Sequence, residues 1–371
     1  MKIIFLANTS WNLYNYRLEL IEHLRLRGNS IVALSPKDKF TSHLVARGLK
    51  WANIDIAARG LNPFYDLWTI SQIYWHYRSE KPDIVSHFTI KCVLYGSWVA
   101  RLLGIKQVIN NITGLGYIFS SNNLTTRVLR PLIISLYRSA LKNTRVIFQN
   151  PDDRSFFISN KIVQEEHTHM VTGSGVVVPK ETVNIGAVPP FLVVLSGRML
   201  WSKGIKVFVD AAQQVRQVRK DIRFVLVGDI STEDLDAIHR AVLDGWVKSG
   251  SVEWWGWVDD MAQVYQQAHI VCLPTSYGEG IPRSLIEASA HARPIIATDM
   301  PGCREIVQPG VNGLLIPPNN PKALAAAVLL LIDNPQTMQK MGLAGQDQVR
   351  QKFSIEKILE QNMEIYQRKP A

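Results

Sequence analysis

Short apolar runs alternate with longer segments of helical spacing along residues 1–180. Lys2–Ala7 and Ser30–Ser35 are typical of buried strands, whereas Leu13–Arg27 has the apolar spacing of a helix and ends at Gly28. The pattern continues with the strand-like runs Ile84–His87, Gln107–Ile112 and Val146–Asn150 and with the helical segment Val93–Leu103. Strands that alternate with helices predict a parallel, doubly wound sheet, whose ligands bind at the carboxyl ends of the strands.

A second series of the same kind follows residues 180–190, which lack periodicity and end in two prolines. Its strand-like runs are Phe191–Ser196, Arg223–Val227, Val252–Trp255, Ile270–Pro274, Pro294–Thr298 and Gly313–Ile316. We therefore predict an α/β fold with two Rossmann-like, doubly wound parallel-sheet domains. The predicted limits are 1–183 for the first domain, 184–190 for a linker, 191–353 for the second domain and 354–371 for a helical tail.

The composition is that of an ordinary globular protein. A chain of 371 residues, 47% hydrophobic and 19% charged, can form two domains with full cores. Its three cysteines, Cys92, Cys272 and Cys303, are too widely spaced for a disulfide framework or a metal site, which favours a reducing cytoplasm. The start, MKIIFLA, is too short for a signal peptide, and no run of 18 apolar residues predicts a membrane span.

The chain carries 41 basic and 31 acidic residues, a net charge of +10. This excess suits nucleic acid, an anionic membrane surface or phosphorylated substrates. The chain has neither zinc-finger spacing nor an aromatic RNA-binding strand, so we expect no nucleic-acid partner. Within Thr126–Arg145, apolar residues at helical spacing are flanked by Arg127, Arg130, Arg138, Lys142 and Arg145. Such a helix can lie on an anionic membrane or cover the sheet, and the sequence leaves both alternatives open.

The segment Tyr277–Ala290, YGEGIPRSLIEASA, follows a strand-like run and opens a helix. Gly278 and Gly280 allow a tight turn close to a ligand, and Pro282 suits the first helical position. The free backbone amides and the helix dipole then favour an anion before the helix. The predicted donor-binding residues of this turn are Gly280, Ile281, Pro282, Arg283 and Ser284.

Two carboxylates, Glu279 and Glu287, flank this predicted anion site. Such a pair suits the hydroxyls of a sugar on one side of a diphosphate and of a ribose on the other. The alternative is an ordinary strand–turn–helix connection with surface acids.

Two cations follow the first predicted strand of the second domain, in SGRMLWSKG. Arg198 and Lys203 lie at the carboxyl end of that strand, where they can neutralise a diphosphate leaving group. The alternative is a pair of surface charges. Asp234-Leu235-Asp236 is a literal D-x-D, which we interpret as the acidic first turn of a helix. Because cations and a helix terminus already supply positive charge, we predict no catalytic metal and no cofactor.

The spacing Glu279–x7–Glu287, with EGIPRSLIEA between its ends, resembles the E-x7-E motif of the retaining GT-B glycosyltransferases of family 4. The G-R-x5-K-G segment and the later segments PGCREIV and NGLLIPP also match this family's patterns. The resemblance implies the GT-B architecture, in which two Rossmann-like domains face a cleft and the last helix, here 354–371, packs back on the first domain. It also implies that Arg198 and Lys203 hold the donor phosphates, Glu279 the sugar hydroxyls and Glu287 the ribose.

Resemblance also supplies the predictions for the first domain. His87 ends a strand, where relatives place a histidine near the reacting carbon; the alternative is a structural histidine. NNITGLGY lacks the third glycine of a dinucleotide fingerprint. It resembles the N-x-x-G-x-G segment of a subgroup that acts on undecaprenyl-diphosphate-linked sugars. Asn12 lies where many members carry a glycine-rich loop. The predicted acceptor or cleft residues are Asn12, Asn111, Thr113 and Gly114, and the predicted catalytic residues are His87, Glu279, Arg198 and Lys203.

The function that the resemblance implies is transfer of a hexose or N-acetylhexosamine from a nucleotide sugar, expected to be UDP-linked, with retained anomeric configuration. The expected acceptor is a polyprenyl-diphosphate-linked saccharide in O-antigen, capsule or other surface-polysaccharide assembly. The expected location is cytoplasmic, with peripheral contact to the anionic inner membrane.

Two alternatives are a non-hydrolysing GT-B nucleotide-sugar epimerase and a non-catalytic glycan- or nucleotide-binding subunit. The first needs acid/base carboxylates that we do not find in the first domain. The second conflicts with intact Arg198, Lys203, Glu279 and Glu287.

Overall fold

The structure is a computed structural model, which describes residues 1–57, 62–115, 124–181, 186, 188–230, 234, 236–276 and 278–368. The chain divides into two compact units. The first unit consists of Met1–Ser174 together with Ile355–Ala371, and the second consists of Gly175–Ser354. Most of the predicted linker, 184–190, falls at or near undescribed residues, and the boundary between the units precedes it. None of the described helices is long and apolar enough to cross a membrane.

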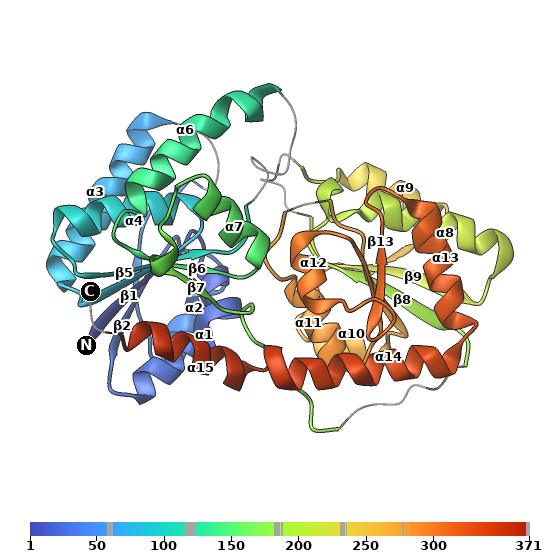
Figure 1. Cartoon of the computed structure of the whole chain (residues 1–371). Coiled ribbons are helices and arrows are strands. Elements are labelled where there is room, and N and C mark those ends of the chain that lie inside the picture. Colours follow the sequence, from blue (N-terminus) through green and yellow to red (C-terminus); the bar gives the residue numbers. More distant parts are fainter. Residues whose placement is uncertain are drawn as a thin grey trace. The chain divides into compact units, whose positions relative to one another are not determined.

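The first unit is built on a seven-stranded parallel sheet with strand order β3-β2-β1-β4-β5-β6-β7 (Figure 1). The order reverses between β1 and β4, as in a doubly wound sheet. The strands are β1 (Lys2–Leu6), β2 (Ser30–Ser35), β3 (Lys50–Asn53), β4 (Ile84–Phe88), β5 (Gln107–Ile112), β6 (Arg145–Phe148) and β7 (Thr168–Met170).

Helices cover both faces of this sheet because alternate strand residues point to opposite sides. Ile4 and Leu6 enter the core formed with α3 (Pro63–Glu80), α4 (Ile90–Leu102), α6 (Leu124–Ala140) and α7 (Pro151–Ser159). Ile3 and Phe5 enter the core formed with α1 (Ser10–Leu26), α2 (Thr41–Ala46) and α15 (Ile355–Tyr366). A short 3₁₀ helix, Glu165–His167, precedes β7.

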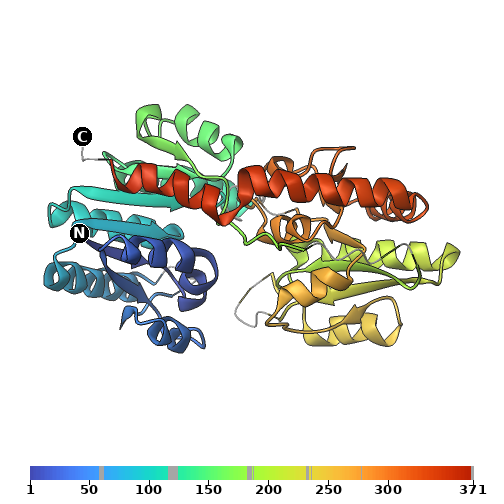
Figure 2. The ribbon, with the colours of Figure 1, turned by 90° about the horizontal axis from the view of Figure 1, so that it is seen from below.

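The last helix, α15, completes the first unit from the far end of the chain, and both views show it on the sheet of this unit (Figures 1 and 2). Tyr366 stacks on Phe5 with 6.1 Å between ring centroids. Its hydroxyl also forms a 2.7 Å hydrogen bond with Ser86 Oγ of β4. The apolar face of α15 therefore belongs to the core of the first unit.

The second unit contains a six-stranded parallel sheet with strand order β10-β9-β8-β11-β12-β13. Its strands are β8 (Phe191–Ser196), β9 (Ile222–Val227), β10 (Glu253–Trp254), β11 (Ile270–Leu273), β12 (Ile295–Thr298) and β13 (Gly313–Ile316). All six lie within a residue or two of their predicted positions. The predicted fold class, two Rossmann-like parallel sheets, is confirmed.

Helices again cover both faces of the second sheet. One core includes α8 (Ile205–Val218), α9 (Arg240–Lys248), α13 (Pro321–Ile332) and α14 (Pro335–Gln348). The other includes α10 (Met261–Gln267), α11 (Arg283–Ala290), α12 (Pro301–Ile306) and the π-helical segment Val349–Phe353. A short 3₁₀ helix, Trp201–Lys203, follows β8.

Side-chain caps set several helix starts. The predicted helix Leu13–Arg27 begins earlier, at Ser10, because Thr9 Oγ1 accepts a hydrogen bond from Asn12 N and caps α1. Helix α3 was not predicted. The sequence does contain the signals of a helix start, because Asn62 caps α3 and Pro63 occupies its first turn. However, apolar residues lie on both the inner and the outer side of this helix, so the pattern of one apolar and one polar side is absent.

Candidate active site

Two loops meet at the carboxyl edge of the second sheet, one after β8 and one after β11. The Ser202 carbonyl oxygen accepts hydrogen bonds from Ser276 N at 2.8 Å and from Thr275 Oγ1 at 3.1 Å. Gly204, with φ +77°, allows this approach, because a Cβ there would lie 2.0 Å from the Pro274 carbonyl oxygen. The fold therefore fixes the segment that carries Lys203 against the segment that leads to Glu279.

Lys203 and Glu279 form an ion pair between these loops. Lys203 Nζ lies 2.6 Å from Glu279 Oε2, and the side chains are only 16% and 14% exposed. Glu279 Oε1 is buried and has no hydrogen-bond partner among the described residues. A buried carboxylate oxygen without a partner costs free energy, so this atom suits a ligand that donates a hydrogen bond. The ammonium group has further N–H donors for an anionic ligand.

Close backbone packing holds the Glu279 loop in place. Gly302, in the first turn of α12, lies so near that an added Cβ would come within 1.5 Å of the Gly280 carbonyl oxygen and 2.8 Å of the Glu279 carbonyl oxygen. Only glycine fits at this position without moving the loop. The sequence pattern PGCREIV contains this glycine, but its packing role was not apparent from the motif.

Helix α11 begins at Arg283, and Pro282 is its N-cap. The prediction that Pro282 is the first helical residue is therefore wrong by one position. The first described amides to bond back to the Pro282 carbonyl are those of Leu285 and Ile286. The amides of Arg283 and Ser284 therefore precede the intrahelical ladder, and an anion site at this helix start stays a prediction. Ile281 and Pro282 are buried, and Tyr277 lies outside the described residues.

Glu287 lies one turn into α11 and is oriented by two neighbours. Its Oε1 accepts a hydrogen bond from Arg283 Nε at 2.7 Å, and its Oε2 accepts one from the Tyr265 hydroxyl at 3.3 Å. Burial raises the pKa of Tyr265 well above its usual range, so this hydroxyl remains a donor. The Glu287 side chain is 25% exposed and therefore accessible to a ligand.

Arg198 and the D-x-D acids form a second connection around the β8 loop. Arg198 Nη1 lies 2.9 Å from Asp234 Oδ2, and Asp236 Oδ2 accepts a hydrogen bond from Ser202 N at 2.9 Å. The predicted acidic first turn of a helix is wrong, since α9 begins only at Arg240 and has no acid in its first turn. The two acids instead hold the loop that carries Arg198 and Lys203, a contact between distant segments that spacing does not reveal.

His87 is fully buried beneath α4. Its Nδ1–H donates to Asn110 Oδ1 at 2.8 Å, and its Nε2 accepts from the Tyr77 hydroxyl at 2.9 Å. Burial lowers the pKa of His87 to about 4, so the ring is neutral. A ring with no exposed surface and both nitrogens engaged has no atom to offer a substrate, so this geometry favours the structural alternative.

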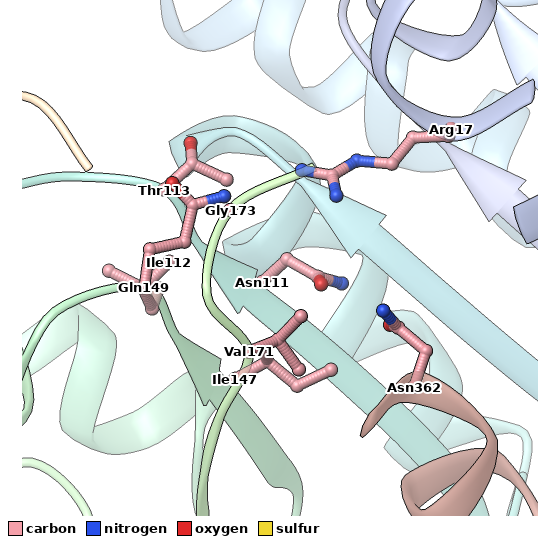
Figure 3. A pocket seen from close by; sticks show the side chains of 9 residues that line it. All are labelled: Arg17, Asn111, Ile112, Thr113, Ile147, Gln149, Val171, Gly173 and Asn362. Carbon is pink, nitrogen blue, oxygen red and sulfur yellow. The ribbon is translucent and has the colours of Figure 1, made fainter. Parts of the chain in front are cut away.

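The predicted acceptor residues gather at the carboxyl edge of the first sheet. Asn111 and Thr113 line a cavity of about 10 Å³, the room of one water molecule, with Arg17 extending over it (Figure 3). The Arg17 guanidinium lies 4.4 Å from the centroid of the Phe88 ring. Gly114 follows with φ +134°, a conformation that glycine adopts readily.

Arg17, Gln149 and Asn362 also line this cavity but were not predicted. Arg17 occupies a buried position of α1 where the helical pattern expects an apolar residue, and that was the available signal. Asn12, the remaining predicted residue, lies in the first turn of α1, and its Oδ1 is buried without a hydrogen-bond partner among the described residues.

The basic segment 126–145 forms most of α6, and its inner side packs on the sheet through Tyr137, Ala140 and Leu141. Arg138 donates to the carbonyl oxygens of Asn160 and Lys161. The segment therefore covers the sheet, while contact with a membrane stays a prediction. The side chain of Arg127 lies outside the described residues.

Two family models match the chain, one for each sheet. Residues 2–150 match the family described as Glycosyl transferase 4-like, and residues 190–334 match the one described as Glycosyl transferases group 1. With two Rossmann-like parallel sheets, the chain is a glycosyltransferase of the GT-B class.

Relatives and solved structures agree with this assignment. The chain is 26% identical over 99% of both proteins to an N,N'-diacetylbacillosaminyl-diphospho-undecaprenol alpha-1,3-N-acetylgalactosaminyltransferase of Campylobacter jejuni. It is 22% identical, over 83% of this chain and 81% of the relative, to a UDP-Gal:alpha-D-GlcNAc-diphosphoundecaprenol alpha-1,3-galactosyltransferase of Escherichia coli. The crystal structure of Anabaena HepE in complex with UDP has the same fold, with a TM-score of 0.78, 19% identity and 99% of both chains covered.

Replacing Lys203 by alanine should lower turnover by about 10²-fold or more, because a preorganised charge on the leaving group is lost. The measurement is the steady-state rate with a nucleotide-sugar donor, with the melting temperature as a check of folding. Lys206→Ala is the matched control, since Lys206 pairs with Asp210 of the same helix on the exposed side of α8. Equal rates for a folded Lys203→Ala protein and the control would remove Lys203 from the site.

Gly96→Ala should destabilise the first unit by about 1–3 kcal/mol, because the added methyl group overpacks a full core. A Cβ at Gly96 would lie 2.5 Å from His87 Nε2, and Tyr77 and Asn110 hold that ring in place. Denaturant unfolding measures the effect. Gly245→Ala, in α9, is the control, because its Cβ meets nothing within 4 Å and should stabilise its helix slightly. A Gly96→Ala protein as stable as wild type would show that the His87 ring moves freely.

Proposed function

We infer that this glycosyltransferase retains anomeric configuration and moves a hexose or N-acetylhexosamine from a UDP-sugar to a polyprenyl-diphosphate-linked saccharide. The observation that carries the donor site is Glu279, whose Oε2 is bound by Lys203 while Oε1 is buried without a partner among the described residues. The names of the relatives from Campylobacter jejuni and Escherichia coli support the lipid-linked acceptor.

The leaving diphosphate belongs between the Lys203 ammonium group and the amides that open α11. The positive charge of Lys203 and the helix dipole both stabilise the negative charge that develops as the donor bond breaks. Arg198 adds a second cation, and its side chain is 52% exposed even though it contacts Asp234. This group of positive charges supports departure of the diphosphate from the face on which the acceptor attacks, as retention requires.

The two carboxylates contact different parts of the donor, Glu279 the sugar and Glu287 the ribose. Glu279 Oε1 accepts a hydrogen bond from a sugar hydroxyl, which places the sugar next to Lys203. Glu287, one turn into α11, accepts hydrogen bonds from the ribose hydroxyls on the other side of the diphosphate. Arg283 and Tyr265 orient its carboxylate for that contact.

The acceptor belongs at the carboxyl edge of the first sheet, near Asn111 and Thr113. The Asn111 amide nitrogen donates to the His87 backbone carbonyl oxygen at 3.2 Å, and the buried His87 ring donates to Asn110, the residue before Asn111, at 2.8 Å. His87 thus acts as a positioning residue. A lipid-linked acceptor would place the protein at the cytoplasmic face of the inner membrane, in the assembly of a surface polysaccharide.

A panel of nucleotide sugars, each incubated with a polyprenyl-diphosphate-linked saccharide, tests this function directly. We expect sugar transfer from a UDP-sugar and an α-linkage when the donor is α-linked, as proton NMR of the product would show. Conversion of a UDP-sugar into its epimer without any acceptor would identify the epimerase alternative instead. Binding of UDP with no transfer to any acceptor would favour the non-catalytic alternative.

Transfer should continue in EDTA. Asp234 and Asp236, the residues of the D-x-D, are committed to Arg198 and to the Ser202 amide, and Lys203 supplies charge for the diphosphate. The measurement compares initial rates before and after exhaustive chelation. If chelation abolishes transfer and Mg²⁺ or Mn²⁺ restores it, the D-x-D acids have a metal-binding role.

Glu287→Ala should weaken UDP binding, whereas Glu279→Ala should chiefly reduce transfer. Loss of a charged hydrogen-bond acceptor for the ribose should cost about 1–3 kcal/mol in calorimetry with UDP. Glu279 contacts the sugar, which UDP lacks, so UDP affinity should change little while turnover falls sharply. Glu360→Ala, on the exposed side of α15, is the carboxylate control. Loss of UDP affinity in Glu279→Ala but not in Glu287→Ala would reverse the proposed orientation of the donor.

A further inference from the structure

Helix α3 of the first unit exposes a row of large apolar side chains, which we name the α3 stripe. Phe64, Leu67, Trp68 and Trp75 are 84%, 62%, 56% and 66% exposed. At 3.6 residues per turn, Phe64, Trp68 and Trp75 fall within about 40° of one another around the helix, and Leu67 lies beside them. Phe64, Leu67 and Trp68 adjoin at one end of the row, and Trp75 lies about 10 Å further along the helix, with Ser71 between Trp68 and Trp75 on the same side.

The opposite side of α3 already has its packing partners. Thr69, Ile73 and Tyr77 are buried against the sheet and α4, so the helix does not need the α3 stripe to hold its place in the fold. A surface helix normally presents polar residues to water. An exposed apolar row that the core does not use indicates an interaction surface.

The arginines of the neighbouring helix α6 favour an anionic partner for the α3 stripe, although one carboxylate, Asp55, accepts hydrogen bonds from Trp68 Nε1 and Gln72 Nε2, both at 3.3 Å. Helix α3 contains two acids, and both are neutralised: Asp66 lies 2.8 Å from Lys91, and Glu80 lies 2.6 Å from Lys50. Helix α6 covers the same side of the sheet, with α4 in contact with both helices (Figure 1). The sequence of α6 contains Arg127, Arg130 and Arg138 and no acid, and its Leu132 is 55% exposed.

We propose that the α3 stripe is the surface by which the first unit inserts into an anionic lipid bilayer. Tryptophan is enriched at the interface of membranes, and a helix that lies in that plane buries one apolar side while nearby cations meet the headgroups. The proposal rests in part on the proposed function, because a lipid-linked acceptor requires an enzyme at the membrane.

The test compares sedimentation with vesicles of phosphatidylcholine and phosphatidylglycerol for wild type and for the triple variant Phe64→Ser, Trp68→Ser, Trp75→Ser. Loss of three interfacial aromatic side chains should lower the vesicle partition coefficient at least about tenfold. The matched control replaces Leu26, Leu102 and Val218 by serine, three exposed apolar residues on other helices, and should bind as wild type does.

A site-specific probe tests insertion independently of the loss of binding. Leu67→Cys labelled with an environment-sensitive fluorophore should shift its emission to the blue when vesicles are added, and the same label at Leu26→Cys should not. The native cysteines, Cys92, Cys272 and Cys303, are all buried and should not react with the dye in the folded protein.

Equal vesicle binding by wild type and the triple variant, or no emission shift at position 67, would overturn the proposal. Conversion of a wild-type dimer to a monomer in the triple variant, with vesicle binding unchanged, would assign the α3 stripe to contacts between copies of this chain instead.

Transfer assays keep this proposal separate from the proposed function. With a short-chain, water-soluble acceptor the triple variant should turn over at the wild-type rate, and with the acceptor in vesicles its rate should fall. Lower turnover with both acceptors would contradict a membrane role. If neither protein glycosylates any acceptor, the proposed function fails, whereas vesicle binding still decides the role of the α3 stripe.

Discussion

The ion pair between Lys203 and Glu279 is the contact on which the proposed chemistry depends. The two residues are 76 positions apart and share a 2.6 Å contact with little exposure to water. A buried ion pair gains little net stability, because desolvation of both charges offsets most of their attraction. In the proposed function its value is positional: it would hold a cation against the diphosphate and leave one oxygen of Glu279 for a hydrogen-bond donor.

The rest of the second unit supports this pair. The parallel sheet brings the ends of β8 and β11 to one edge, Ser202 joins the two loops through its carbonyl, and Asp236 fixes the Ser202 amide. Gly204 and Gly302 permit backbone approaches that any side chain would block. These contacts hold the two charges in a fixed geometry before a ligand arrives, which is the condition under which electrostatic stabilisation is effective.

Much of the fold follows from local sequence pattern, because strands buried on both faces are continuous apolar runs. The six strands of the second sheet were predicted within a residue or two for that reason. Helix α3 was missed because its outer side is apolar too, so the pattern lacks a polar side. The edge strands β3 and β7 have only four and three residues, and Thr168 is the one buried residue among them. Their sequences therefore lack the continuous apolar run that predicts a strand.

In the candidate site, the sequence predicts where the residues lie better than it predicts which side chains pair. The motif residues Lys203, Glu279 and Glu287 are brought to one edge of the sheet, as the positions of their strands predict. What the sequence does not reveal is which charge meets which: Arg198 contacts Asp234, and the structural role of the D-x-D follows from that contact. The burial of His87 likewise depends on Gly96, a residue with no motif of its own.

The most direct test of the donor site is a crystal structure of the protein with an intact, non-transferable UDP-sugar analogue. We expect Glu279 Oε1 to lie within hydrogen-bond distance of a sugar hydroxyl, with Lys203 Nζ on a phosphate oxygen and Glu287 on the ribose. A donor bound elsewhere, or with its sugar away from Glu279, would contradict this expectation.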